Sequence, residues 1–318
     1  MELEIKATGG ILFLSSIAKS IGSKVEGDLV KIPEHLGKGH IKGYIINPNM
    51  SMMIRQYEVH KNLKFKIVAD KQRSETIMIA FHNVFREKEA SRAELPYVQM
   101  ASAGLDTSFF IPAQTKMNSI IIGINAAYLK DLLGLKEGHW FLQAIMPNNK
   151  PFLFEQIISP QIQEVAAEIV EKEIIEELQK FYLKVKTEEL IFLLLLELLK
   201  RKDTSIGSLN IADVQMIYKV KDKILTRLDI PPNLSELAAF ACISESKLKR
   251  LFKQIFGNSI YSYYQTIRIN EAAYLLREEK LSVSEVGYRL GFSNLSHFSR
   301  VFEEHIGTKP KKYWLMQS

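Results

Sequence analysis

A sequence pattern near the C-terminal end of the chain occurs twice. Residues 250–257 (RLFKQIFG) are followed fifty positions later by residues 300–307 (RVFEEHIG). A shorter pair of matching segments, 235–238 and 284–287, precedes the two copies. Each copy predicts the same supersecondary unit, which is a short helix, a turn and a longer helix. The sequence therefore predicts two helix-turn-helix units in one chain.

Both units begin and turn in similar ways. Asn233 and Ser282 each stand three residues before a glutamate, which is the spacing of a capping box at a helix start. The turn between the helices needs a residue that tolerates a positive φ angle, and Gly291 supplies it in the second unit. Cys242 occupies the corresponding place in the first unit. We therefore expect strain in the first turn.

The longer helix of each unit has one apolar face at helical spacing. This face consists of Leu248, Leu251, Phe252, Ile255 and Phe256 in the first unit and of Phe298, Val301, Phe302 and Ile306 in the second. Side chains outside it, near the helix start, occupy the positions from which a recognition helix contacts DNA bases. They are Ser246, Lys247, Lys249 and Arg250 in the first unit, and Asn294, Ser296, His297, Ser299 and Arg300 in the second. Lys253 also falls outside the apolar face, further along the first helix.

Arg250 and Arg300 occupy the same position in the two units. Arginine can donate two hydrogen bonds to guanine, and such a pair discriminates between bases by about 1–3 kcal/mol. Ordinary solvation explains a single exposed Lys or Arg equally well. The paired placement favours DNA contact for these two.

One helix is expected between the units, over residues 259–279, with Tyr264, Ile267, Ala272, Leu275 and Leu276 as its packing face. A rigid connector would fix the distance between the two recognition helices. If that distance matches one turn of B-DNA, about 34 Å, a single chain enters two successive major grooves. Such a chain would not need a palindromic site.

Positive charge accompanies the repeat. From Ser208 onward 16 Lys and Arg stand against 11 Asp and Glu, net +5, whereas the rest of the chain has 26 against 25, net +1. This excess favours an approach to phosphates, although it also suits a merely soluble domain. The length of 318 residues predicts two domains.

The first half of the chain predicts strands. Short β-branched and aromatic runs separated by Gly, Pro and Asn are typical of a sandwich or a barrel. The expected strands cover residues 41–47, 51–59, 63–68, 75–85, 119–125 and 139–146. A helix over residues 126–133 interrupts them, with Asn125 as its N-cap and Gly134 as its end.

Helical periodicity begins at Ser159. The first helix places Ile162, Val165, Ala166, Ile169 and Ile174 on one face. A second helix over residues 186–201 is apolar nearly all round, so it must cover the sheet on one side and something else on another. A second subunit is the favoured candidate, although burial within one chain also fits.

The C-terminal residues resemble the DNA-binding domain of the AraC/XylS family of bacterial transcription regulators. The resemblance covers residues 209–314, about a third of the chain. It rests on Leu237, Ala238, Ser244, Leu248, Arg250, Phe252, Gly257, Arg268, Ala272, Leu275, Leu276, Val283, Gly291, Phe292, Phe298, Ser299, Arg300, Phe302, Gly307, Pro310 and Tyr313. Cys242, Gly287 and Trp314 depart from the pattern, where Gly, Ala and Arg are usual.

This resemblance implies a seven-helix, all-α domain with two helix-turn-helix units that bind promoter DNA. By motif position the base-facing residues are Ser246, Lys249 and Arg250 in the first unit, and Leu295, Ser296, His297, Ser299 and Arg300 in the second. A regulator of this kind can also contact RNA polymerase. Loss of the usual Arg at Trp314 removes one phosphate contact.

The resemblance also implies that the upstream part is a sensor, because many members carry a cupin-like β-barrel followed by dimerisation helices. We therefore expect an α+β protein of four parts. These are a β-rich, cupin-like barrel or sandwich at 1–155, a helical dimerisation segment at 156–202, a linker at 203–208 and the DNA-binding domain at 209–318. Barrel mouths often bind small molecules, so an effector is expected there.

Arg55, Tyr57 and His60 lie on or beside an expected strand and are candidates to contact an anionic or aromatic effector. An exposed strand face explains them equally well. Two alternatives to metabolite sensing stay open. In one the N-terminal domain responds to a protein partner, and in the other the barrel is catalytic and the DNA-binding domain regulates it.

No catalytic, metal or cofactor site is predicted. The histidines lack the His-x-His spacing followed by Glu that metal-binding cupins use, and phosphate-binding loops and Ser/His/Asp arrangements are missing from the sequence. Cys242 is the single cysteine, and neither an export signal nor an apolar run of about 20 residues is present. We expect a cytoplasmic, homodimeric DNA-binding regulator with no membrane partner and no enzymatic activity.

Overall fold

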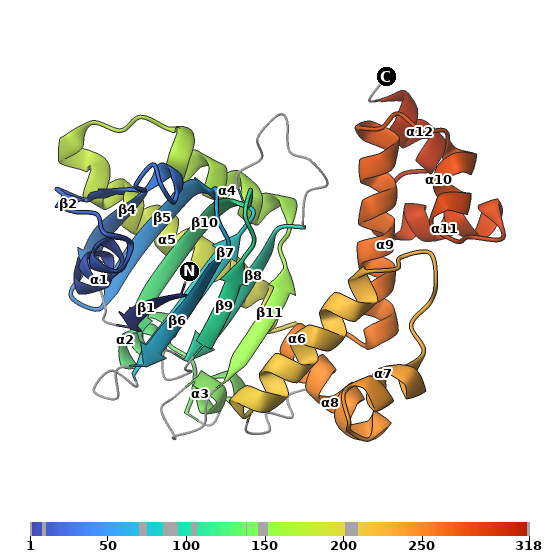
Figure 1. The fold of residues 1–318 in the computed structure, drawn as a ribbon, viewed down its shortest axis with the longest axis horizontal. Helices are drawn as coiled ribbons and strands as arrows, with labels where there is room; N and C mark the ends of the chain where they lie inside the picture. The colour runs from blue at the N-terminus through green and yellow to red at the C-terminus, as the bar shows by residue number, and fades with distance from the viewer. Residues whose placement is uncertain are drawn as a thin grey trace. The chain divides into compact units, whose positions relative to one another are not determined.

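A computed structural model describes residues 2–7, 11–69, 75–84, 95–102, 107–137, 139–145, 152–200 and 209–316. The chain divides into two compact units, Met1–Ile211 and Ala212–Ser318. The N-terminal unit combines strands and helices, whereas the described part of the C-terminal unit is helical (Figure 1). No helix in the described part of the chain is long and apolar enough to cross a membrane.

An eight-stranded antiparallel sheet organises the N-terminal unit. Its strand order is β11-β8-β7-β10-β5-β4-β3-β2, so β11 and β2 form its edges. The strands are β2 (Val25–Glu26), β3 (Leu29–Lys31), β4 (Gly37–Asn47), β5 (Met50–Val59), β7 (Thr76–His82), β8 (Tyr97–Ser102), β10 (Lys116–Asn125) and β11 (Leu153–Ile157). The central strand β10 pairs with β5 from Lys116↔Glu58 to Ile124↔Met50.

A smaller sheet lies against one face of the large sheet (Figure 1). It consists of β1 (Glu2–Ala7), β6 (Leu63–Ala69) and β9 (Thr107–Ile111), with β1 parallel to β6 and β9 antiparallel to it. Helix α1 (Ile11–Ile21) covers the same face. Leu63 and Phe65 of the small sheet join Met53 and Ile121 of the large sheet in one apolar cluster. Two sheets in face-to-face contact agree with the sandwich expected from the strand-rich sequence.

Helices cover the opposite face of the large sheet. They are α2 (Ala126–Leu133), α3 (Trp140–Ile145), α4 (Pro160–Glu171) and α5 (Glu176–Leu198). Alternate residues of a strand point to opposite faces, so Met52 and Ile54 of β5 contact the helical core while Met53 contacts the small sheet. Lys186 of α5 forms ion pairs with Glu168 of α4 at 2.7 Å and with Glu189 at 2.8 Å. The pair with Glu168 holds α4 beside α5.

Several sequence predictions for this unit are confirmed. Asn125 caps α2 by accepting a hydrogen bond from the Tyr128 N–H at 3.1 Å, and Gly134 ends the helix with φ +56°. Expected strands correspond to β4, β5, β6, β7 and β10, and the first expected helix to α4. The second expected helix, α5, begins at Glu176 rather than at residue 186. The expected linker at 203–208 lies outside the described residues.

The expected strand at 139–146 is wrong. This segment forms α3 instead, in which Phe141, Leu142 and Ile145 are buried. A run this short fits either period, and packing on one helical face decides between them. The His139 ring nitrogen Nδ1 accepts a hydrogen bond from the Phe141 N–H at 3.3 Å and helps to start the helix. Helix α1 also escaped prediction.

The C-terminal unit has seven helices within residues 209–316, the number that the family resemblance implies. They are α6 (Ile211–Leu225), α7 (Leu234–Phe240), α8 (Glu245–Phe256), α9 (Ile260–Arg277), α10 (Val283–Arg289), α11 (Leu295–Ile306) and α12 (Pro310–Leu315). Helix α9 runs through the unit, with α7 and α8 towards one end and α10 to α12 towards the other (Figure 1). It therefore connects the two helix-turn-helix units.

Replacing Leu190 with Ala tests whether α5 completes the core of the N-terminal unit. Leu190 is fully buried, so the free energy of unfolding should fall by about 2–5 kcal/mol. Leu132→Ala is the matched control, because Leu132 also lies in a helix but is 41% exposed, and its effect should stay within about 0.5 kcal/mol. Urea denaturation of the two variants measures the difference, and equal losses would contradict this packing.

Candidate DNA-binding interface

The two turns are closed by the same backbone hydrogen bonds. In each turn three successive N–H groups donate to carbonyl groups of the preceding short helix. In the first unit the pairs are Ala241 to Leu237, Cys242 to Ala239 and Ile243 to Ala238, at 3.0, 3.1 and 3.1 Å. In the second they are Leu290 to Val286, Gly291 to Tyr288 and Phe292 to Gly287, at 3.0, 2.9 and 2.9 Å. The sequence repeat is thus a repeat of turn geometry.

Both turns contain one residue with positive φ, which is +53° at Cys242 and +75° at Gly291. The expected strain at Cys242 is confirmed, because side chains with a Cβ rarely adopt this region. Gly291 has a second reason to be glycine. A Cβ built at Gly291 would lie 1.9 Å from the carbonyl oxygen of Asp229. Cys242 is exposed, and a side chain fits there.

Helix caps position the start of each helix. Asn233 caps α7 by accepting hydrogen bonds from the N–H groups of Ser235 and Glu236 at 3.0 and 3.3 Å. At α10 the reciprocal capping box is complete, because the Ser282 hydroxyl accepts from the Glu285 N–H and the Glu285 carboxylate accepts from the Ser282 N–H. Burial plays no part in these local bonds, which explains why the sequence predicted both starts.

The longer helices α8 and α11 bury the faces that the sequence predicts. Leu248, Leu251, Phe252, Ile255 and Phe256 are buried in α8, as are Phe298, Val301 and Phe302 in α11, while Ile306 is half-buried. The opposite faces are open to solvent. Of the predicted DNA-binding residues, Ser246, Lys249, Arg250, Asn294, Ser296, His297 and Arg300 are exposed, and Lys247, Leu295 and Ser299 are half-buried.

Several predicted contact residues also have structural partners. Lys247 forms an ion pair with Asp213 of α6 at 2.9 Å, and Lys249 forms one with Glu245 at 3.6 Å. Asn294 is the N-cap of α11 and accepts hydrogen bonds from two backbone N–H groups. Leu295 packs against α10, where a Cβ at Gly287 would meet it. These residues shape the interface as well as lining it.

Arg250 and Arg300 differ from those residues. Both are exposed, and neither forms an ion pair with any residue that the structure describes. Arg250 and Arg300 stand at the same position of the repeat, and two buried residues follow each of them, at 251–252 and at 301–302. Their guanidinium groups are therefore available to a nucleic acid at equivalent places in the two units.

A hollow beside α11 is lined by several of the predicted DNA-contact residues of the second unit. It has a volume of about 520 Å³ and is lined by Leu295, Ser296, Ser299, Arg300, Glu303 and Lys309. Lys309 precedes α12 and was not among the predicted contacts. Sequence spacing within one helix does not reveal it, because the turn after Gly307 brings it beside α11. The hollow adds a second cation to the face that presents Arg300.

Helix α9 holds the second turn in place. Arg268 is buried, its Nε donates to the Leu290 carbonyl at 2.8 Å, and its guanidinium carbon lies 3.6 Å from the centre of the Phe292 ring. The Tyr264 hydroxyl donates to the Leu228 carbonyl at 2.9 Å. Burial lowers the pKa of Arg268, whereas the nearby Tyr264, Tyr261 and Asp229 oppose this shift. These bonds fix the turn on the connector.

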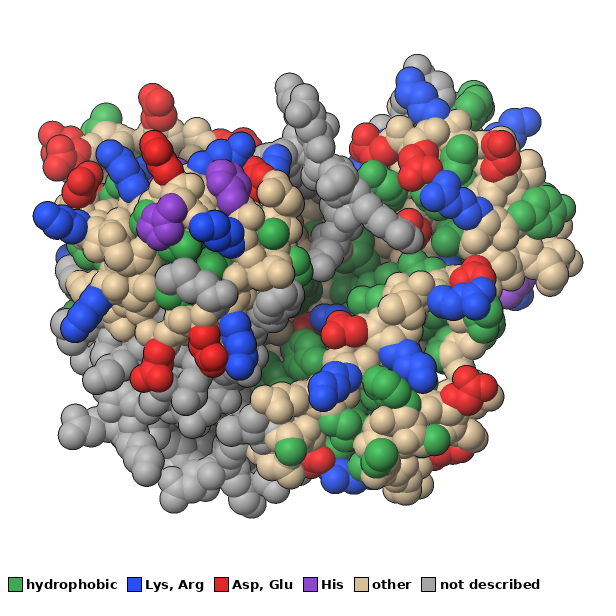
Figure 2. Space-filling view, in the orientation of Figure 1, with side chains coloured by type: hydrophobic (Ala, Val, Ile, Leu, Met, Phe, Trp, Pro, Cys, Tyr) green, Lys and Arg blue, Asp and Glu red, His purple; other side chains and the backbone are tan. Residues whose placement is uncertain are grey.

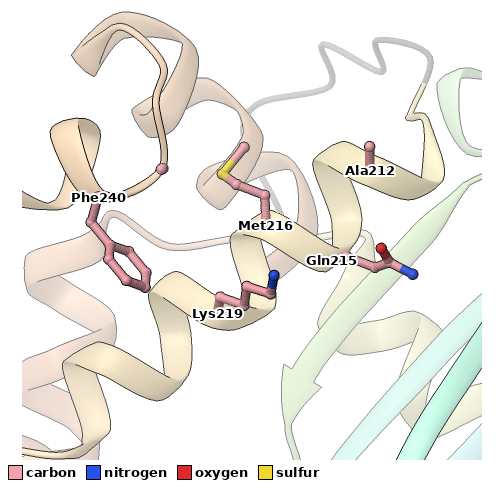
Figure 3. A pocket seen from close by; sticks show the side chains of 6 residues that line it. Ala212, Gln215, Met216, Lys219 and Phe240 are labelled. Atoms are coloured by element: carbon pink, nitrogen blue, oxygen red, sulfur yellow. The ribbon is translucent and has the colours of Figure 1, made fainter.

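The face of the C-terminal unit shown in Figure 2 mixes basic, acidic and apolar side chains. A further hollow of about 430 Å³ lies between α6 and the end of α7 and is lined by Ala212, Gln215, Met216, Lys219, Phe240 and Ala241 (Figure 3). Lys219 is the one ionisable group among these six, so the hollow holds no pair for acid–base chemistry. Among described residues no group of three His, Cys, Asp or Glu could hold a metal ion.

The candidate ligand contacts of the N-terminal unit separate into two environments. Arg55 and Tyr57 are buried neighbours on β5, and the Tyr57 hydroxyl is hydrogen-bonded to the Arg55 side chain. Burial raises the pKa of Tyr57, and the charge and hydrogen bond of Arg55 oppose that rise. His60 follows the end of the strand and is exposed, and its backbone N–H donates a hydrogen bond to the Leu36 carbonyl at 2.8 Å. The structure therefore does not bring His60 to the other two.

Comparison with known proteins matches residues 237–314 to a family of sequences described as a helix-turn-helix domain. The protein named "HTH-type transcriptional activator RhaR" from Cronobacter sakazakii is 38% identical over 90 residues, which are 28% of this chain and 31% of the relative. The arabinose operon regulatory protein of Escherichia coli is 33% identical over 81 residues, 26% of this chain and 28% of the relative. The chain thus spans about a third of the length of these relatives.

A solved structure of an AraC-type transcriptional regulator from Chromobacterium violaceum is 26% identical, with a TM-score of 0.32, over 34% of this chain and 97% of that one. The family match falls within the C-terminal part, and these two relatives are named as a transcriptional activator and an operon regulatory protein. The predicted resemblance is confirmed: the C-terminal domain is an AraC-type helix-turn-helix domain.

Replacing Cys242 with Gly should stabilise the first turn. Glycine adopts positive φ without a Cβ penalty, so the free energy of unfolding of the C-terminal unit should rise by about 1 kcal/mol. Cys242→Ala keeps the Cβ and should bring no gain. Gly291→Ala should lower stability by about 2–4 kcal/mol, because its Cβ meets the Asp229 carbonyl as well. Chemical denaturation checks all three, and a loss with Cys242→Gly would contradict strain at this residue.

Proposed function

We propose that this protein is a transcription regulator that binds promoter DNA through its C-terminal unit and adjusts that binding to a small molecule held by its N-terminal unit. The observation that carries the proposal is the repeated turn geometry, with Arg250 and Arg300 exposed at equivalent places. Two such units in one chain can bind two segments of the same DNA duplex. We place this activity in the cytoplasm.

In the proposed complex the N-terminal halves of α8 and α11 enter the major groove. Arg250 and Arg300 contact bases, because an arginine without a protein partner can donate its paired N–H groups to guanine. Neighbouring base-facing residues are Ser246 and Lys249 on α8, and Leu295, Ser296, His297 and Ser299 on α11. Lys247 and Lys309 suit the phosphate backbone, where contacts position the protein without reading sequence.

Helix α9 links the two recognition helices, which the proposed complex places along one face of DNA. An 18-residue helix is about 27 Å long, somewhat less than the roughly 34 Å between successive major grooves on one face. Arg268 and Tyr264 hold the surrounding segments to this helix. Both recognition helices of a single chain would therefore bind one asymmetric DNA site as a rigid unit.

The sensing role of the N-terminal unit rests on its construction. Two sheets pack face to face through one apolar cluster, and helices cover the other face of the large sheet. We infer a cupin-like sensor, in which ligand binding favours one arrangement of the chain over another and so changes DNA affinity. A regulator of this kind would also contact RNA polymerase at the promoter. Whether it activates or represses depends on where its site lies.

We also propose that α5 makes the protein a homodimer. Large apolar side chains are exposed along this helix and at its caps, Ile175 and Leu199, between 37% and 67% of their surface. Six of them, which follow Ile175, are Leu178, Phe181, Val185, Phe192, Leu196 and Leu199. Consecutive members are separated by 3, 4, 7, 4 and 3 residues, a series that reads the same in both directions. We call these six residues the α5 stripe.

A stripe with this symmetry matches itself when a second copy of α5 lies antiparallel across a two-fold axis between residues 188 and 189. Such an isologous interface repeats each contact twice. Val185 would then meet the partner's Phe192, and Lys180 would meet the partner's Glu197. Glu197 is half-buried, and its Oε2 atom accepts no hydrogen bond from the residues that the structure describes. We expect the Lys180 ammonium of a second copy to pair with this carboxylate.

Alanine substitution at the two arginines tests DNA reading. Arg250→Ala and Arg300→Ala should each weaken binding to a cognate promoter fragment by about 1–3 kcal/mol and relax base preference near the lost contact. Arg277→Ala is the control, because Arg277 lies at the C-terminal end of α9 and its Nε donates a hydrogen bond to the Glu278 carboxylate. Gel-shift titrations against cognate and scrambled DNA measure both effects. Unchanged affinity and base preference in both variants would remove these arginines from the interface.

Charge substitutions test the dimer. Phe192→Glu should convert the protein to a monomer in sedimentation experiments, whereas Ile45→Glu on the exposed part of β4 should leave the dimer intact. Lys180→Glu should weaken the dimer by placing two carboxylates together, and addition of Glu197→Lys should restore it. Failure of the double variant to restore the dimer would exclude the antiparallel register.

A further inference from the structure

Polar side chains form a row across the face of the large sheet that the small sheet and α1 cover. Arg55 on β5 pairs with Ser119 on β10, Ser119 pairs with His82 on β7, and His82 pairs with Tyr97 on β8. Met53 and Tyr57, two residues to either side of Arg55, belong to the apolar cluster on this face. We call Arg55, Ser119, His82 and Tyr97 the polar row.

Arg55 is buried, and no residue that the structure describes is its counter-ion. It is 9% exposed, and its Nε donates a hydrogen bond to the Ser119 hydroxyl at 2.8 Å. Tyr57 bonds to the same guanidinium. Arg55 forms no ion pair with any residue that the structure describes. Arginine is almost never fully buried unless it is paired, because removal of a charge from water is costly.

The nearest acidic residues along the strands do not supply the missing charge. Glu58 is on the opposite face of β5 from Arg55 and pairs with Lys38 at 3.2 Å. Glu155 is 2% exposed and accepts a hydrogen bond from Gln99 at 3.0 Å. It lies on β11, four strand spacings from β5 in the sheet order, or about 19 Å between backbones. The positive charge of Arg55 is therefore unmatched among the described side chains of this sheet.

We infer that the polar row binds the carboxylate of a small organic monoanion, with Arg55 as its counter-ion. This inference rests on the proposed sensing of a small molecule and names its chemical class. The planar fork of an arginine matches the two oxygens of a carboxylate. The single cation of the row balances one negative charge, whereas a phosphate would bring about two at neutral pH.

The surroundings of the row fit an anion with an apolar body. Met53, Met117 and Ile121 lie on the same face in the same cluster. The His82 and Tyr97 rings at the end of the row are stacked on each other, with centroids 4.7 Å apart. A carboxylate at Arg55 would place the rest of its molecule among these groups. A negatively charged ligand bound there would therefore change the contact between the two sheets.

Thermal unfolding of the full-length protein tests the inference, with sodium benzoate, phenylacetate and octanoate as probes and the corresponding amides as neutral controls. A carboxylate should raise the wild-type Tm in proportion to the logarithm of its concentration, and its amide should not. Arg55→Met should weaken carboxylate binding about ten- to hundredfold. Arg277→Met, at an exposed ion pair, should bind the probes as the wild type does.

The Tm of Arg55→Met without a probe gives a second readout. It should equal or exceed that of the wild type, because an apolar side chain of similar length removes an unpaired buried charge. If Arg55→Met does not fold, Arg55→Lys decides, because loss of the planar fork should still weaken carboxylate binding about tenfold. No carboxylate response in the wild type, or a response unchanged in the Arg55 variants, would overturn the inference.

Gel shifts of the wild type without any probe separate this inference from the proposed function. Retained DNA binding together with no carboxylate response would overturn the anion site and leave the regulator intact. A carboxylate response that depends on Arg55, together with no binding to any promoter fragment, would support the site and contradict DNA regulation.

Discussion

The buried hydrogen bond from Arg268 to the Leu290 carbonyl is the interaction on which the second DNA-reading unit depends. Leu290 ends α10, and Phe292, which stacks on the same guanidinium, begins the path to α11. One side chain therefore holds both sides of a turn. Helix α10 has only seven residues, and a helix of that length is not stable alone in water. Its orientation must come from tertiary contacts such as this one.

The first unit reaches the same geometry by another route. Phe252 and Phe256 of α8 pack against Tyr263 of α9, with ring centroids 5.5 and 5.1 Å from the tyrosine. An aromatic cluster takes the place of a buried cation. The first turn has no close neighbour that requires a glycine, and a strained Cys242 is tolerated there. Two units with the same backbone turns thus depend on the connector through different chemistry.

In the N-terminal unit the large sheet separates two cores, and each face meets a different partner. The helical face is closed by α4 and α5, and α5 carries a second apolar surface away from the sheet. The other face is largely apolar but carries the polar row and the hydrogen-bonded pair Gln99 and Glu155. Natural proteins break the rules of apolar core packing mainly at functional sites, and the buried charge of Arg55 is such a departure. The sensing and dimerisation proposals therefore concern opposite faces of one sheet.

The sequence by itself determined the elements whose causes lie within a few residues. The repeat predicted two helix-turn-helix units, the capping residues Asn125, Asn233 and Ser282 predicted helix starts, and helical spacing predicted the buried faces of α8 and α11. Each depends on hydrogen bonds or periodicity local to one segment. Exposure of Arg250 and Arg300 followed from the same spacing.

Only the tertiary structure decided what depends on distant residues. Segment 139–146 was expected as a strand and forms a helix, because a short apolar run acquires its period from the surface it packs on. The link from Arg268 to Leu290, the carbonyl of Asp229 against Gly291 and the place of Lys309 beside α11 all join segments apart in sequence. The same holds for Arg55, whose burial without a carboxylate among the described residues follows from the order of the strands. Such contacts leave no periodic signal in the chain, because they depend on how separate elements meet.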